Sequence, residues 1–181
     1  MAAEVTEAAL RLFAEQGFDA TTVDDIARAA GMSKRSFFRY FAAKEDVVLG
    51  GVDLMSERIV AELADRPGGE DPWVSLHAVL RGWAERIDGE QRTLDSLRLI
   101  EGSPELRAGY HRKREEVRAE ITAALVSRTG LDAFTADLLT AGAGAAIDCA
   151  SREWARSGGS RPELVDRAFA LLRPAVAESS R

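Results

Sequence analysis

The sequence is short of cysteine and of long apolar runs. Cys149 is the single cysteine among 181 residues, which excludes a disulfide within the chain and a zinc site built from cysteines. No stretch approaches the roughly 18 consecutive apolar residues of a membrane span. The first residues, MAAEVTEAALRLF, carry acids and lack the basic start of a signal peptide. We therefore expect a cytoplasmic protein with no membrane partner.

Proline is also scarce, and runs of β-branched residues with a period of two are absent. Most of the five prolines fall in short connectors, and between the connectors apolar residues recur with the spacing of an amphipathic helix. We therefore predict an all-α fold of about nine helices, in which three short helices occupy residues 3–41. Longer helices are expected near residues 44–65, 76–87, 90–101, 104–128, 132–156 and 163–177.

Positive charge is confined to one short segment of an acidic chain. The formal net charge is −6, from 30 acidic and 24 basic residues, which excludes a uniformly basic nucleic-acid coat. Residues 1–25 carry −5, residues 26–44 carry +5 without a single acid, and residues 45–181 carry −6. Clustered cations can displace counterions from DNA phosphates. Any approach to DNA must therefore use residues 26–44.

Residues 22–41 have the pattern of a helix-turn-helix, two short helices joined by a turn that contains glycine. Ile26 and Ala27 give the first helix a narrow apolar edge. Gly31 permits a left-handed backbone where the chain turns. Ser33 can cap the second helix, whose N-terminus also favours a phosphate oxygen. The basic side chains of that second helix are long enough to reach guanine edges in the major groove.

A basic run on a short helix is more often only a solvated face, so the charge alone does not decide. The adjoining aromatics, the glycine turn and the preceding helix together favour DNA binding. The segment resembles the N-terminal signature of the TetR family of bacterial transcriptional regulators. The resemblance covers about residues 5–50 and rests on Ala8-Ala9, Leu12-Phe13, Gly17-Phe18, Thr22-Val23, Ile26-Ala27, Ala30-Gly31-Met32-Ser33, Ser36-Phe37-Phe38-Arg39-Tyr40-Phe41 and Lys44-Glu45.

The resemblance implies roles for individual residues at a DNA interface. Base edges would be contacted from the second helix of the motif, by Lys34, Arg35 and either Phe38 or Arg39. Phosphates would be contacted by Thr22, Ser36, Tyr40 and Lys44. The sequence departs from the family at Phe38, where tyrosine is usual, and no basic arm precedes the first helix. The implied domains are a DNA-binding domain over residues 1–45 and a ligand-binding and dimerisation domain over residues 46–181.

The resemblance further implies a homodimer. The run Ala-Gly-Ala-Gly-Ala-Ala at residues 141–146 falls inside an expected helix, although each glycine there costs roughly 1 kcal/mol relative to alanine. Small residues on one face let another backbone approach closely. We predict that the dimer interface contains Gly142, Ala146, Leu164 and Ala168. Close packing within one chain is the alternative.

A small-molecule effector, largely apolar, is the third implied partner, besides the DNA operator and a second copy. Its candidate contacts lie on the inward faces of the central helices, where each is alternatively a plain core residue. They are Met55, Trp83, Leu97, Ile100, Tyr110 and Ile121. The basic run after His111 could instead attract an anionic effector such as a coenzyme A thioester. No metal or cofactor is expected.

These expectations define a ligand-responsive transcriptional repressor that binds a palindromic operator as a dimer and is released by its effector. The alternative is a DNA-binding scaffold or regulator that has no effector. A tightly packed core between residues 45 and 130 would favour the scaffold, and a cavity of several hundred cubic ångströms would favour the switch. An enzyme is not expected, because no acid, base and nucleophile converge and histidine occurs only at His77 and His111.

Overall fold

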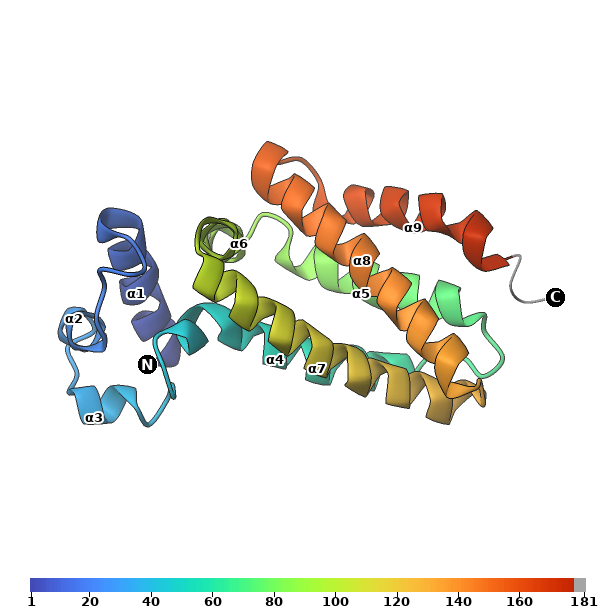
Figure 1. Cartoon of the computed structure of the whole chain (residues 1–181), viewed down its shortest axis with the longest axis horizontal. Helices are drawn as coiled ribbons and strands as arrows, with labels where there is room; N and C mark the ends of the chain where they lie inside the picture. The colour runs from blue at the N-terminus through green and yellow to red at the C-terminus, as the bar shows by residue number, and fades with distance from the viewer. Residues whose placement is uncertain (178–181) are drawn as a thin grey trace. The chain divides into compact units, whose positions relative to one another are not determined.

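The computed structural model describes residues 1–177, apart from the side chains of residues 51, 53, 54 and 174–177. Within this part the chain forms nine α-helices and no strand, which confirms the predicted fold class (Figure 1). None of these helices combines the length and the apolar character that crossing a membrane requires. The helices are α1 (Ala2–Gln16), α2 (Val23–Ala29), α3 (Lys34–Phe37), α4 (Glu45–Ala64), α5 (Pro72–Ile87), α6 (Gln91–Gly102), α7 (Pro104–Thr129), α8 (Ala133–Ser157) and α9 (Arg161–Ala177).

The helices form two compact units that are interleaved in sequence. Unit 1 contains residues 1–52 and 91–112, and unit 2 contains residues 53–90 and the chain from residue 113 onward. Helices α4 and α7 therefore contribute to both units. The functional boundary after residue 45 stays a prediction.

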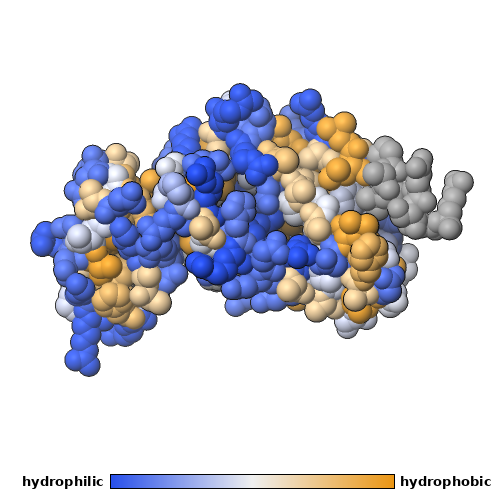
Figure 2. All heavy atoms as spheres, viewed as in Figure 1, coloured by the Kyte–Doolittle hydropathy of each residue, from blue (hydrophilic) through white to orange (hydrophobic). Residues whose placement is uncertain are grey.

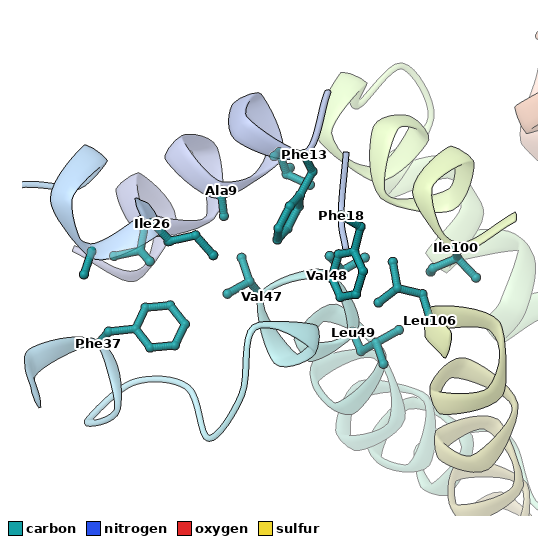
Figure 3. Close-up of a cluster of buried hydrophobic side chains, with 13 residues drawn as sticks. Ala9, Phe13, Phe18, Ile26, Phe37, Val47, Val48, Leu49, Ile100 and Leu106 are labelled. Atoms are coloured by element: carbon teal, nitrogen blue, oxygen red, sulfur yellow. The ribbon is translucent and has the colours of Figure 1, made fainter. Parts of the chain in front are cut away.

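Unit 1 is built around one apolar cluster (Figure 3). Phe37 of α3 and Ile26 of α2 are fully buried in it, and Figure 3 shows Phe37 pointing toward Val47 in the first turn of α4. Ile100 of α6 and Leu106 of α7 belong to the same cluster. The first three helices are too small to bury a sufficient core by themselves, and these later helices supply the missing apolar surface.

Unit 2 is centred on α5, α8 and α9, each of which packs against the other two. Trp73 of α5 lies with its ring 4.6 Å from that of Phe169 on α9. The guanidinium of Arg161, at the start of α9, is buried 4.2 Å from the ring of Trp83 and 5.3 Å from that of Trp154. Arg161 thus joins three helices by cation–π contacts, supported by a 2.7 Å hydrogen bond from its Nη2 to the hydroxyl of Ser151.

Candidate nucleic-acid interface

Helix α2 begins at a capping box formed by Thr22 and Asp25. The backbone N–H of Asp25 donates to Thr22 Oγ1 at 3.2 Å, and the backbone N–H of Thr22 donates to Asp25 Oδ2 at 3.1 Å. The Thr22 hydroxyl also donates to Asp25 Oδ2 at 2.6 Å. These hydrogen bonds from Thr22 are the main reason why the pKa of Asp25 is lowered. The box fixes where the first helix of the motif starts.

Helix α3 follows a turn at Gly31, whose φ of 66° lies in the left-handed region that favours glycine. Ser33 caps the helix, because its Oγ accepts a hydrogen bond of 3.1 Å from the backbone N–H of Ser36. Regular α-helix ends at Phe37, earlier than the sequence pattern indicated. The next residues continue as a tighter turn, in which the N–H of Tyr40 donates to the carbonyl of Phe37 at 2.9 Å.

The two sides of α3 have opposite character. Phe37 faces the core, whereas Lys34, Arg35 and Arg39 are exposed. The rings of Phe38 and Tyr40 are also exposed, by 48% and 40%, beside these cations. Arg35 has no hydrogen-bonding or ion-pair partner among the described residues. The fully buried Phe37 therefore anchors a surface of cations and aromatic rings that faces away from the core of unit 1.

Two of the cations on this surface have neighbours that the charge count alone does not reveal. Lys34 Nζ lies 2.9 Å from Asp24 Oδ2, so an acid of α2 offsets a cation of α3. Arg39 Nη2 donates to Tyr40 Oη at 3.1 Å, and its guanidinium lies 5.1 Å from the Tyr40 ring centre. Folding thus places a carboxylate of the acidic segment, residues 1–25, beside a cation of the basic segment, residues 26–44.

Lys44 occupies a different position from the other predicted contacts. Its half-buried ammonium donates to the carbonyl oxygens of Phe18 at 2.9 Å and Thr21 at 3.2 Å, and lies 4.3 Å from the Phe18 ring centre. Lys44 therefore ties the start of α4 to the loop between α1 and α2. Its contact with a phosphate stays a prediction.

Two family models match this chain. One, described as bacterial regulatory proteins of the tetR family, matches residues 5–50, and the other, described as the MftR C-terminal domain, matches residues 70–177. The regulator TcmR of Streptomyces glaucescens is 34% identical over 171 residues, which span 89% of this chain and 76% of that protein. The chain belongs to the TetR family. It is a transcriptional regulator of that family.

Solved structures of other bacterial regulators share this fold at low sequence identity. The NalD repressor of Pseudomonas aeruginosa is 21% identical, with a TM-score of 0.66 over 96% of this chain and 93% of that one. FadR of Bacillus subtilis, solved in complex with stearoyl-CoA, is 19% identical, with a TM-score of 0.61 over 94% and 96% of the two chains. At these identities the likeness shows the fold alone.

In this TetR-family chain the six predicted ligand contacts divide equally between the units. Leu97, Ile100 and Tyr110 belong to unit 1, where Ile100 is a core residue and Tyr110 packs against the same cluster. In unit 2, Met55 is buried and Trp83 lies against Arg161. Ile121 alone among the six lines the cavity of about 420 Å³ between α5, α7 and α8. Their role in binding stays a prediction.

Charged residues line that cavity as well, and one of them, Arg114, belongs to the basic run after His111. Arg114 and Arg118 line it from α7, and Asp148 lines it from α8. The two arginines are four residues apart, so helical spacing predicts that they share one face of α7. The sequence does not indicate which helix packs against that face. No group of three or more metal-ligating side chains occurs anywhere in the described part of the chain.

Of the four predicted dimer contacts, two lie on α8 and two lie on α9. A Cβ on Gly142 would lie 3.5 Å from the ring of Trp73 in the same chain, and Ala146 is buried. These two residues thus show the intrachain packing that the sequence left open as an alternative. Leu164 and Ala168 of α9 are half-buried. Their role in a dimer stays a prediction.

Large apolar side chains are exposed elsewhere on the same two helices. They are Phe134 and Leu138 of α8, exposed by 76% and 56%, and Leu171 of α9, exposed by 72%. In Figure 2 hydrophobic residues, drawn in orange, gather over the part of unit 2 that contains the start of α8 and helix α9. Helical spacing places Ala145 and Cys149, both exposed, on the side of α8 that carries Leu138.

Proposed function

We propose that this TetR-family protein is a repressor that binds a palindromic operator as a homodimer and is released from it by a small molecule. The proposal rests on the α3 surface, which consists of the exposed side chains of Lys34, Arg35, Phe38, Arg39 and Tyr40. Buried Phe37 anchors this surface to the core of unit 1. Arg35 is the cation best suited to a base edge, because no protein group competes for its guanidinium within the described residues.

Polar groups on the α3 surface and beside it are suited to contacts with the DNA backbone. The exposed hydroxyls of Ser33 and Tyr40 can contact phosphate oxygens, and Thr22 offers the N-terminus of α2. Lys34 reaches DNA only if it exchanges Asp24 for a base or a phosphate. Binding is therefore local and depends on salt, because each phosphate contact releases condensed counterions.

A dimer would place two copies of α3 in successive major grooves, about 34 Å apart along the duplex. The exposed side chains Phe134, Leu138 and Leu171 support an interface on α8 and α9, because apolar groups of this size gain stability when a partner covers them. Two similar proteins support repression, since NalD and KstR2 of Mycobacterium tuberculosis are both called repressors.

The cavity in unit 2 supports release by an effector rather than a scaffold without one. Its volume of about 420 Å³ is in the range of small-molecule sites. FadR, a structural neighbour, binds an acyl-coenzyme A. An effector releases the protein only if its affinity is higher for the conformation that cannot fit the operator than for the conformation that can. Helix α4 contributes residues to both units and would carry the change.

The experiment has two steps. The dimer is first used to select its operator from random duplex DNA, and the selected sequence should be an inverted repeat. Operator complexes are then titrated with a library of small molecules while fluorescence anisotropy is recorded. A compound that releases the wild-type protein, and does so at higher concentration when Gly144→Leu fills the cavity, supports the proposal. A selected site without symmetry, or release unaffected by filling the cavity, contradicts it.

A further inference from the structure

One apolar side chain lies among the polar groups of the α3 surface. Phe38 is 48% exposed and is the one exposed phenylalanine among the described residues of unit 1. It stands among the exposed side chains of Arg35, Arg39 and Tyr40. A phenyl ring can neither donate a hydrogen bond to a phosphate oxygen nor neutralise its charge. The α3 surface therefore contains one group that the DNA backbone cannot satisfy.

The ring of Phe38 is packed against the core of unit 1. Its centre lies 5.6 Å from that of the buried Phe37 ring, and the two planes meet at 86°, which is an edge-to-face contact. The backbone N–H of Phe38 donates to the carbonyl of Lys34 at 3.1 Å, so the helical turn that begins at Lys34 includes Phe38. Because the backbone and the ring are both held, Phe38 loses little conformational freedom when a partner covers it.

The major groove of DNA offers a phenyl ring one suitable partner. Base edges there present hydrogen-bonding groups, and the C5 methyl group of thymine is the apolar exception. A ring placed over donors or acceptors would remove their water without replacing it, which is unfavourable. A ring placed over a thymine methyl group instead buries apolar surface on both partners. Thymine is therefore the base that fits Phe38.

Arg39, the other residue expected to contact a base near the end of α3, already has a partner. Its Nη2 donates to Tyr40 Oη at 3.1 Å, and its guanidinium lies 5.1 Å from the centre of the Tyr40 ring. Arg39 must give up these contacts to reach a base, whereas Phe38 has no polar contact to exchange. Of the two residues, Phe38 is the better placed.

The spacing of Phe38 from Arg35 limits where the thymine can be. The two residues are three positions apart, so they lie on the same side of the helix. Three residues of α-helix span about 4.5 Å, and successive base pairs are about 3.4 Å apart along the duplex. The bases that the two side chains contact are therefore adjacent or separated by a single base pair.

We propose that Phe38 recognises a thymine of the operator through its C5 methyl group, one or two base pairs from the base that Arg35 contacts. Phe38 is then a residue that determines specificity, because no other base pair presents this methyl group to the major groove. The inference rests on the proposed binding of α3 to an operator, and it names part of the sequence which that operator contains.

The test replaces the thymines of the selected operator, one at a time, with deoxyuridine, which lacks the methyl group but forms the same base pair. Fluorescence anisotropy gives the affinity of the full-length protein for each duplex. At one thymine of a half-site, wild type should bind the deoxyuridine duplex about fourfold more weakly, as expected for one methyl group left unburied. Phe38→Ala should bind the thymine and deoxyuridine duplexes equally.

Tyr40→Phe is the matched control, because it changes the other exposed ring of the α3 surface. It should alter the affinity for both duplexes by the same factor, so that the fourfold difference remains. The base that Arg35 contacts is located separately, as the base pair whose substitution no longer weakens binding by Arg35→Ala. Circular dichroism confirms that each variant folds, and a ratio of two affinities is insensitive to a uniform loss of active protein.

The inference is overturned if no deoxyuridine within two base pairs of that position weakens binding by wild type. It is equally overturned if the fourfold difference persists in Phe38→Ala, since another residue would then contact the methyl group. Failure to select any operator would refute the proposed function and this inference with it. A selected operator without a methyl-dependent thymine would refute only the role of Phe38.

Discussion

The Nζ atom of Lys34 lies 2.9 Å from Oδ2 of Asp24, so a cation expected at a base edge is paired with an acid from the preceding helix. Both side chains are more than half exposed, and exposed pairs of this kind contribute little stability. The pair therefore acts mainly on the electrostatics of the α3 surface. DNA must compete with Asp24 for Lys34.

Asp24→Asn should therefore raise the affinity for DNA of any sequence. Removing one negative charge from the α3 surface lowers the repulsion of phosphates, and we expect a gain of a few fold at low salt that shrinks as salt is added. Fluorescence anisotropy across a salt series measures it, with Asp65→Asn in unit 2 as the matched control. Weaker binding by Asp24→Asn would show that the pair instead positions Lys34 for its contact.

Lys44→Met should lower the stability of the protein. The substitution leaves the carbonyl oxygens of Phe18 and Thr21 without their donor, and hydrogen bonds from charged groups contribute roughly 1.5–3 kcal/mol. Urea denaturation followed by circular dichroism measures the change. If stability is unchanged and only DNA affinity falls, Lys44 is instead the phosphate contact that the family resemblance implied.

Leu138→Asp should separate the proposed dimer into monomers. Leu138 is 56% exposed, so a carboxylate at this position should cost the monomer little stability. In the proposed interface the same carboxylate would be buried without a partner of opposite charge. Analytical ultracentrifugation measures the mass, and Ala119→Asp, at an exposed position of α7, is the control. A Leu138→Asp protein that still sediments as a dimer would place the interface on another face.

Stability should fall in acid partly through Glu70. Hydrogen bonds from Arg66 and Ser75 lower the pKa of this carboxyl from 4.5 to about 2. Above pH 4.5 the carboxylate is ionised in both the folded and the unfolded chain, and its stabilising effect is complete. Between pH 4.5 and 2 the unfolded chain takes up the proton first, so this stability is lost.

Glu70→Gln removes that ionisation and should give a shallower loss of stability over the same pH range. Urea midpoints of wild type and Glu70→Gln, measured at several pH values, test the difference. Parallel curves for the two proteins would mean that Glu70 does not contribute to the acid response.

The periodic apolar residues and the turn at Gly31 were enough to predict the helices, and Ser33 marked where α3 begins. The partners of individual cations could not be predicted in this way. Lys44 lies 26 residues from Phe18, and local pattern does not register such contacts. The sequence count of positive charge over residues 26–44 likewise missed Asp24, which only folding brings to Lys34.

The small residues of α8 show a second limit. Gly142 and Gly144 both permit close approach, and a helical pattern gives the face of each but not the element that covers it. In the structure Trp73 covers Gly142, and Arg114 of α7 lies beside the cavity next to Gly144. The environment of Trp83 was hidden for the same reason, because Arg161 reaches its ring from the start of α9.

In the proposed function α3 contacts the bases of the operator, with Arg35 at a base edge. The most direct measurement is the affinity of wild type and Arg35→Ala for the selected operator and for random DNA, with Arg112→Ala on α7 as the control. We expect Arg35→Ala to lose roughly 1–3 kcal/mol on the operator and far less on random DNA, so that discrimination falls. An Arg35→Ala protein that binds the operator as tightly as wild type would contradict the assignment of α3 as the reading helix.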